Sequence, residues 1–203
     1  LTQDQLSRTL MPVGDYEKDE IREIAKKFNL RVANKPDSQE ICFVSDNDYA
    51  SFVESEIGKK MPEGNFVTAD GEVLGKHKGI LHYTIGQRKG LGIALGHPIF
   101  VTEIRPETNE VVIGENDDVF GYSLEANNLN AMAVEKFFDG MRAVGKIRYS
   151  HKGEHCTIKV LGEDRIRIDF DKKVRAITPG QAVVLYDESG LVLGGGTIIK
   201  RCD

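Results

Sequence analysis

One of the three cysteines, Cys42, stands where a thiol could carry sulfur. It lies in residues 36–43, between two segments of helical periodicity and just before the second begins. A helix N-terminus favours thiolate over thiol, and the thiolate is the nucleophile. The nearby carboxylates of Asp37 and Glu40 would act in the opposite direction. The alternative is a buried structural cysteine, because free cysteines are among the most buried residues.

The other two cysteines have no pattern of reactivity. Cys156 alternates with Ile158 and Val160 on one face of an expected strand, which indicates a core position, and Cys202 is nearly terminal. Three scattered cysteines without a C-x-x-C pair argue against a disulfide scaffold and for a reducing, cytoplasmic compartment. The five histidines have no metal-ligand spacing with them, so we expect no metal.

The run from His77 to Gly92 mixes cations, amides and glycines. It could wrap a phosphate backbone through Gln87, Arg88 and Lys89, with Tyr83 as a stacking face. Its glycine spacing is not the dinucleotide fingerprint. A structured loop in which the glycines merely permit unusual backbone angles explains the composition equally well.

Two further groups suit contacts with phosphates and bases. Arg148 and Tyr149 end an expected strand, and Gln181 follows the turn Thr178-Pro179-Gly180 into another. A guanidinium, a phenol and an amide at strand ends are typical of RNA contacts. Each of them is also common on the solvated rim of a barrel.

The elements that must position these groups change in character along the chain. The first 60 residues have helical periodicity: Thr2 and Gln5 form a capping-box pattern before Leu6 and Leu10, and Asp15 could cap a second helix. A third helix is expected from Ser45 to the stop at Gly58.

After residue 60 the period becomes two. One hairpin joins residues 66–68 and 72–74 through an Asp-Gly turn, and another joins 99–104 and 110–113. The last third predicts strands that alternate regularly with turns, at residues 141–149, 155–160, 165–170, 181–186 and 191–199. Such spacing indicates a small barrel, with a bulge or close backbone approach at Gly194-Gly195-Gly196.

The sequence therefore predicts an α+β chain that is mainly β. Its parts are a helical segment (1–60), a small central β-domain (61–122) and a C-terminal β-barrel (123–203). The net charge of −5 argues against nucleic acid as an average, but residues 123–203 hold 13 Lys/Arg against 11 Asp/Glu. A basic face on the barrel is compatible with that balance. No apolar run approaches the length of a membrane span.

Four segments in this order resemble the tRNA-specific 2-thiouridylases (the MnmA/TrmU family), and the resemblance covers essentially the whole chain. They are KPDSQEICF at 35–43, YTIGQRKGLGI at 83–93, TPGQ at 178–181 and LGGG at 193–196. The first two are highly specific.

The resemblance implies that the intact enzyme converts the wobble uridine of tRNA to 2-thiouridine. ATP adenylates the C2 oxygen, a cysteine persulfide delivers sulfur, and AMP leaves. Cys42 matches the persulfide-bearing cysteine, which an upstream cysteine attacks or joins in a disulfide. Arg148, Tyr149 and Gln181 match tRNA contacts. The implied partners are tRNA and a cysteine desulfurase or sulfur-relay protein, the implied state is a monomer, and no membrane is involved.

This sequence departs from the family pattern in the part that activates the substrate. The Ser-Gly-Gly-x-Asp-Ser phosphate loop and the upstream cysteine are absent from these 203 residues, which begin with Leu1. We therefore expect a C-terminal fragment that has no ATP-binding residues and is inactive alone. The resemblance implies that its residues 1–60 are the helical tail of the catalytic domain. The alternatives are a non-catalytic RNA-binding β-barrel protein with a structural Cys42, and a sulfur carrier that does not modify RNA.

Overall fold

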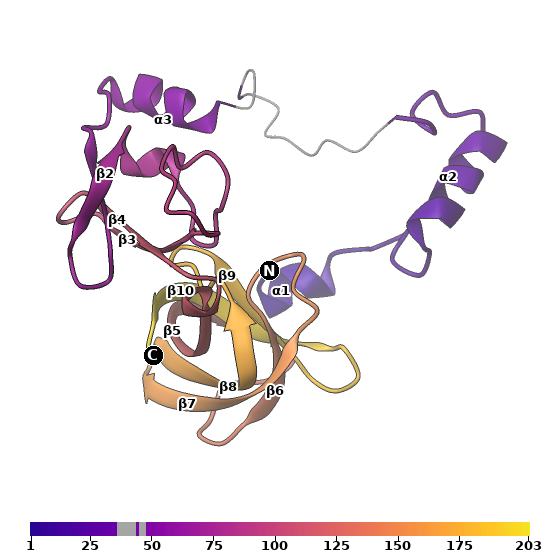
Figure 1. Ribbon diagram of the computed structural model, residues 1–203. Coiled ribbons are helices and arrows are strands. Elements are labelled where there is room, and N and C mark those ends of the chain that lie inside the picture. Colours follow the sequence, from indigo (N-terminus) through magenta and orange to yellow (C-terminus); the bar gives the residue numbers. More distant parts are fainter. Residues whose placement is uncertain (36–43, 45–47) are drawn as a thin grey trace. The chain divides into compact units, whose positions relative to one another are not determined.

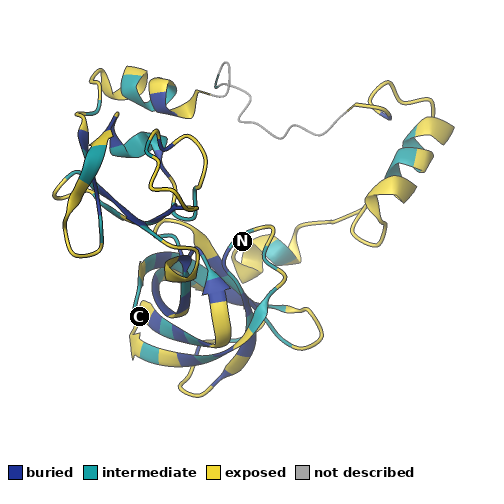
Figure 2. Cartoon of the chain, in the orientation of Figure 1, coloured by how far each residue is buried: buried dark blue, intermediate teal, exposed yellow. Residues whose placement is uncertain are grey.

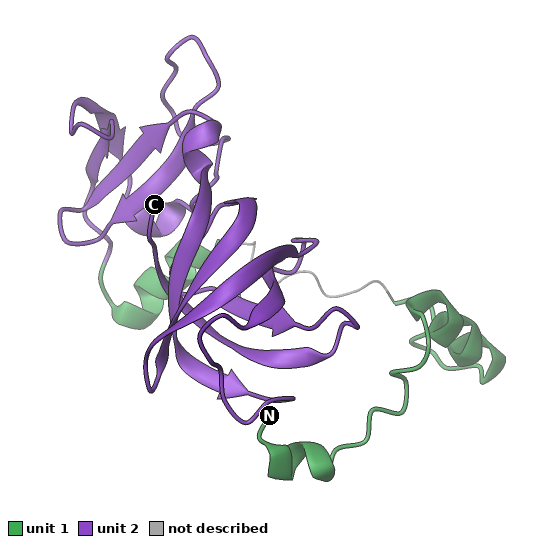
Figure 3. Ribbon diagram, turned by 90° about the horizontal axis from the view of Figure 1, so that it is seen from below, with its two compact units in different colours: residues 1–59 green, residues 60–203 purple. Residues whose placement is uncertain are grey.

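A computed structural model describes residues 1–35, 44 and 48–203 of the chain. The chain forms two compact units, residues 1–59 and residues 60–203 (Figure 3). The three expected domains (1–60, 61–122 and 123–203) stay a prediction.

The first unit contains short helices: α1 (Gln3–Ser7), α2 (Lys18–Lys27) and α3 (Tyr49–Ile57) (Figure 1). The capping box of α1 is confirmed, because Gln5 N donates to Thr2 Oγ1 and Thr2 N donates to Gln5 Oε1. The helix ends before Leu10, however, which is 88% exposed, so the expected pairing of Leu6 with Leu10 on one helical face is wrong.

The other two helix starts differ from expectation. The helix α2 begins after Glu17, whose N–H donates to Glu20 Oε2 over 2.7 Å, rather than after Asp15. In α3 the cap is Asp48, which accepts from Ser51 N at 3.0 Å, while the expected cap Ser45 lies outside the described residues. The stop at Gly58 is confirmed by its left-handed backbone, with φ +67°.

A four-stranded mixed sheet opens the second unit, in the order β2-β1-β4-β3. Both expected hairpins are confirmed, and a parallel pairing of β1 with β4 joins them. Its strands are β1 (Gly64–Val67), β2 (Val73–His77), β3 (Phe100–Arg105) and β4 (Glu110–Gly114). The Asp-Gly turn is closed by Gly71 N donating to Thr68 O, with Gly71 at φ +87°.

Six antiparallel strands then close a barrel in the order β10-β5-β8-β7-β6-β9, which confirms the predicted architecture. They are β5 (Phe120–Ala131), β6 (Arg142–Lys146), β7 (Glu154–Gly162), β8 (Arg165–Arg175), β9 (Ala182–Tyr186) and β10 (Val192–Arg201). Burial alternates along these strands (Figure 2), with residues such as Leu124, Ile158, Ile168 and Leu185 filling the interior. Strand β5 was not predicted, although it joins β8 to β10.

The glycine triplet lies where β10 crosses between its two neighbours. A Cβ at Gly195 would collide with the carbonyl oxygen of Val183 in β9, and one at Gly196 would lie 2.6 Å from Asn127 O in β5. The register of β10 shifts on both sides of this point. The expected close backbone approach is therefore confirmed, and the fold as a whole is mainly β, as predicted.

Candidate functional site

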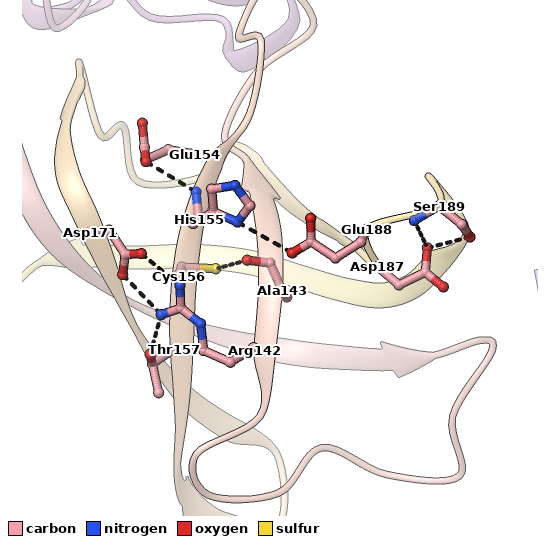
Figure 4. A network of polar contacts seen from close by, with 10 residues as sticks. All are labelled: Arg142, Ala143, Glu154, His155, Cys156, Thr157, Asp171, Asp187, Glu188 and Ser189. Atoms are coloured by element: carbon pink, nitrogen blue, oxygen red, sulfur yellow. Dashed lines mark hydrogen bonds and ion pairs between the residues drawn. The ribbon is translucent and has the colours of Figure 1, made fainter.

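Cys42, the candidate sulfur carrier, falls in residues 36–43, outside the described residues. The other two cysteines are described, and neither suits thiolate chemistry. Cys156 is fully buried and its Sγ lies 3.4 Å from Ala143 O (Figure 4). Burial raises the pKa of its thiol to about 12. The prediction of a core position for Cys156 is confirmed.

Cys202 follows β10 and lies beside a carboxylate. Its Sγ is 3.7 Å from Glu125 Oε1. Partial burial, and then the negative charge of Glu125, raise the pKa of the Cys202 thiol above its ordinary value. At neutral pH both described thiols therefore stay protonated, which weakens them as nucleophiles.

The strand pairing brings the expected RNA contacts of the barrel to one end. In the antiparallel pair β6–β9, Val144 is opposite Tyr186 and Lys146 is opposite Val184. Strand β6 ends at Lys146, two residues before Arg148, and Gln181 directly precedes β9. Because the end of β6 lies opposite the first part of β9, these two segments leave the strand pair at the same end.

Arg148 and Tyr149 lie in the turn after β6, and not at the end of a strand as expected. His151 N donates to Arg148 O at 3.1 Å, and His151 Nδ1 accepts from Ile147 N at 3.4 Å. Strand β6 ends at Lys146, so Arg148 and Tyr149 lie in the turn instead of in the strand. Tyr149 is fully exposed, at 105% of its reference area, and its ring is free to stack.

Gln181 emerges from a tight turn. Its N–H donates to Thr178 O, and Gly180 has φ +85°, which suits the third position of a type II turn after proline. Its own carbonyl accepts from Ile198 N at 2.8 Å, so the backbone is held by β10 while the residue stays exposed. The amide side chain is thus presented at the barrel rim.

In the glycine-rich loop, two expected roles change. Tyr83 is 7% exposed and packs edge-on against Phe66 and His77, with ring centroids 5.1 and 5.5 Å away. The prediction that it offers a stacking face is therefore wrong. Gln87 uses its amide inside the loop, accepting from Thr84 N at 3.0 Å and donating to Lys89 O at 2.9 Å.

The cations Arg88 and Lys89 of this loop are exposed, as is Lys78 near its start. The loop is anchored at its start by His77, whose Nδ1 accepts from Gly79 N and whose Nε2 lies 3.1 Å from Asn109 O. Burial lowers the pKa of His77, so the ring is neutral at pH 7 and can accept. Gln87 and His77 thus shape the loop, and Arg88 and Lys89 face solvent.

Arg175 of β8 ties this loop to the barrel. Its guanidinium lies 5.3 Å from the ring centroid of Phe100 and 5.8 Å from that of Phe120. Its Nη2 donates to Gly86 O at 3.4 Å, immediately before Gln87. A small apolar cluster of Ile85, Phe100, Val119 and Ala176 packs beside it.

We expect Arg175→Ala to destabilise the second unit. Cation–π contacts with two rings, and the packing of the side-chain stem, are together worth about 1–3 kcal/mol. The midpoint of thermal unfolding should fall by about 3–10 °C. Circular dichroism would measure this, with Arg175→Lys as the variant that keeps the charge and should lose less. An unchanged melting temperature for Arg175→Ala would contradict this role.

A cavity of about 1080 Å³ lies within the second unit and includes Gln181 and Lys200 in its wall. Its apolar lining comes from side chains such as Ile85, Ile104 and Ile177. The charged residues of the wall are Asp70, Glu103, Glu115, Asp118, Asp203, Lys200 and Arg201. With five carboxylates against two cations, this cavity does not fit a nucleoside triphosphate.

Three protein families match consecutive parts of the chain. Residues 1–46 match the tRNA methyl transferase HUP domain, residues 50–115 the tRNA methyl transferase PRC-barrel domain, and residues 123–198 the aminomethyltransferase beta-barrel domain. A protein of Lachnoclostridium phytofermentans named tRNA-specific 2-thiouridylase MnmA is 64% identical over 200 residues, covering 98% of this chain. The chain is a homologue of the tRNA-specific 2-thiouridylases.

Other 2-thiouridylases match as extensively. The MnmA proteins of Clostridioides difficile and Carboxydothermus hydrogenoformans are 54% and 51% identical, over 98% and 99% of this chain. The chain spans only about half the length of these curated relatives, 55–56% of each of the three. The resemblance found in the sequence motifs is therefore confirmed.

Two general observations concern the part of the chain that the structure describes. No three His, Cys, Asp or Glu side chains gather there in a way that could hold a metal ion. No helix there is long and apolar enough to cross a bilayer.

Proposed function

We propose that this chain is the tRNA-facing part of a tRNA-uridine 2-sulfurtransferase. Cys42 carries the persulfide sulfur that goes to C2 of the ATP-activated wobble uridine. Arg148, Tyr149 and Gln181 contact the tRNA, and the loop cations Arg88 and Lys89 add phosphate contacts. ATP is bound by the HUP domain of the intact enzyme, of which residues 1–46 match a part. The 203-residue chain alone is inactive.

The observation that supports this proposal is the placement of these residues at one end of the β6–β9 pair. An exposed phenol and a guanidinium follow β6 there, and an exposed amide directly precedes β9. Stacking on Tyr149 and charge-assisted bonds from Arg148 are the means by which proteins hold unpaired nucleotides. The identity with the 2-thiouridylases supports RNA as the ligand.

Replacing Tyr149 by Ala should weaken tRNA binding by the 203-residue chain about 5- to 150-fold. The loss of one base–aromatic stack is worth about 1–3 kcal/mol, and 1.4 kcal/mol is tenfold in affinity. Tyr149→Phe is the matched control, because it keeps the stacking face and removes only the hydroxyl. Fluorescence anisotropy with a tRNA transcript that has uridine at the wobble position would measure the dissociation constants.

Arg148→Ala and Gln181→Ala complete this test. Arg148→Ala should also reduce the dependence of affinity on salt by about one counterion, whereas the neutral change at Gln181 should leave that slope unaltered. If Tyr149→Ala, Arg148→Ala and Gln181→Ala all bind tRNA as the unaltered chain does, the RNA-facing assignment is wrong.

A further inference from the structure

A row of cations crosses the outer face of four barrel strands. Lys200 of β10 is opposite Glu125 of β5, Glu125 is opposite Arg167 of β8, and Arg167 is opposite Lys159 of β7. Arg165 joins the row by donating from Nε to Glu125 Oε2 at 2.8 Å. We call Lys159, Arg165, Arg167 and Lys200 the cationic row. Three strand spacings give it a length of roughly 15 Å.

Strand alternation and one bulge give these side chains their direction. The neighbours Ile158, Ile166 and Ile168 are fully buried, so Lys159, Arg165 and Arg167 point outward. Ile198 of β10 is also buried, and regular alternation would send Lys200 inward with it. The register shift between Ile198 and Lys200 turns Lys200 outward instead, to 3.2 Å from Glu125 Oε1. Bulges commonly re-aim a side chain in this way near functional sites.

The carboxylates of this surface lie beneath or beside its cations. The Glu125 side chain is 11% exposed, whereas those of Arg165 and Lys200, which pair with it, are 48% and 55% exposed. Arg167 is held in place by Asp169 Oδ1 at 2.7 Å and by Ser123 Oγ at 3.2 Å. Within the row, four cations stand against two carboxylates, and the ion pairs order the side chains of Arg165, Arg167 and Lys200, which lowers the entropic cost of binding an anion.

We propose that the cationic row is a second phosphate-contacting surface for tRNA, beyond the rim residues. This inference rests on the proposed function for its choice of RNA as the partner. Lys200 of the row and Gln181 of the rim both belong to the wall of the cavity described above. Its length covers several phosphates of one RNA strand, and guanidinium groups suit phosphate oxygens geometrically.

The ion pair of Arg142 with Asp171 on the same barrel can be compared with the cationic row. Arg142 donates to both oxygens of Asp171, at 2.9 and 2.6 Å, and to Thr157 Oγ1 (Figure 4). Its charge is matched one to one by an equally exposed carboxylate, with side chains 52% and 45% exposed. Arg167 of the row has a similar one-to-one partner in Asp169, with side chains 38% and 46% exposed, so the excess of positive charge in the row comes from Lys159 and from Arg165 and Lys200, which share Glu125.

The cleanest test replaces Lys159, which is exposed and lies outside the ion pairs described above. In the 203-residue chain, Lys159→Ala should weaken binding of the tRNA transcript about threefold at 50 mM salt and reduce the salt slope by about 0.7–0.9. The double change Lys159→Ala with Arg167→Gln should roughly double the loss of slope. Lys136→Ala, an equal change of charge in the connection between β5 and β6, is the control and should match the unaltered chain. Lys159→Arg should retain the slope.

The outcomes separate this inference from the function on which it rests. If Lys159→Ala behaves like Lys136→Ala while Tyr149→Ala still weakens binding, the cationic row is excluded and the proposed function stands. If Tyr149→Ala and Lys159→Ala both leave affinity unchanged, the proposed function fails as well. If poly-glutamate binds the chain as tightly as tRNA and loses as much affinity on Lys159→Ala, the row is a surface for acidic polypeptides and the RNA assignment is overturned.

Discussion

An intact enzyme with Cys42→Ser should lose tRNA thiolation completely, and with it the ability to hold labelled sulfur. A persulfide forms when a thiolate attacks the outer sulfur of a donor, and a hydroxyl cannot replace it. Because all the sulfur then passes through Sγ of Cys42, we expect the substitution to abolish thiolation completely.

The described cysteines explain why no substitute is expected within this chain. Cys156 is sealed in the barrel with a pKa of about 12, and the pKa of Cys202 is raised by burial and by Glu125. Neither thiol is both accessible and deprotonated near pH 7, as a sulfur acceptor must be. Cys156→Ser and Cys202→Ser are therefore matched controls that should keep thiolation, although Cys156→Ser places a hydroxyl in an apolar core and should cost stability.

The measurement uses the intact enzyme with a cysteine desulfurase and labelled cysteine, followed by mass spectrometry of the cysteine peptides. We expect the label on Cys42 of the unaltered enzyme. We expect no 2-thiouridine in tRNA treated with Cys42→Ser. Full thiolation by Cys42→Ser would return this residue to a structural role.

The predictions from sequence succeeded where a local rule decides the structure. The hairpin at Asp70-Gly71, the stop at Gly58 and the alternation of β7 each follow from a few adjacent residues, and the structure has all three. They failed where partners distant in sequence decide. Strand β5 was missed because its segment is rich in Asn, Gly and Ala and has Glu125 at a buried position. Only pairing with β8 and β10 makes it a strand.

The candidate site divides in the same way. The residue types at Arg148, Tyr149 and Gln181 were recognised, but their placement at one end of the β6–β9 pair depends on the strand register. Tyr83 was taken for a surface aromatic because nothing in its own segment reveals that Phe66 and His77 enclose it. The cationic row was missed altogether. The alternation of Arg165 and Arg167 with isoleucines is a signal for an outward basic face, but the bulge that turns Lys200 outward has none.

A substitution in the glycine triplet should have a large effect on the stability of the barrel. Replacing Gly195 by Ala should destabilise the barrel by about 3 kcal/mol or more, at the upper end of what overpacking costs. The added Cβ would meet the backbone carbonyl of Val183, which cannot rotate away as a flexible side chain could. Relief requires β9 and β10 to separate, and their ladder from Thr197–Ala182 to Val192–Tyr186 closes the barrel.

Gly162→Ala provides the control for this change. Gly162 ends β7 in the same barrel, it is exposed, and a Cβ there would meet no atom within 4 Å. Its effect should lie within about 0.5 kcal/mol, as for ordinary surface substitutions. Thermal unfolding followed by circular dichroism should place Gly195→Ala about 10 °C or more below the unaltered chain. Equal melting temperatures for Gly195→Ala and Gly162→Ala would mean that the two strands have room at this crossing, and the tight closure of the barrel at β9–β10 would be refuted.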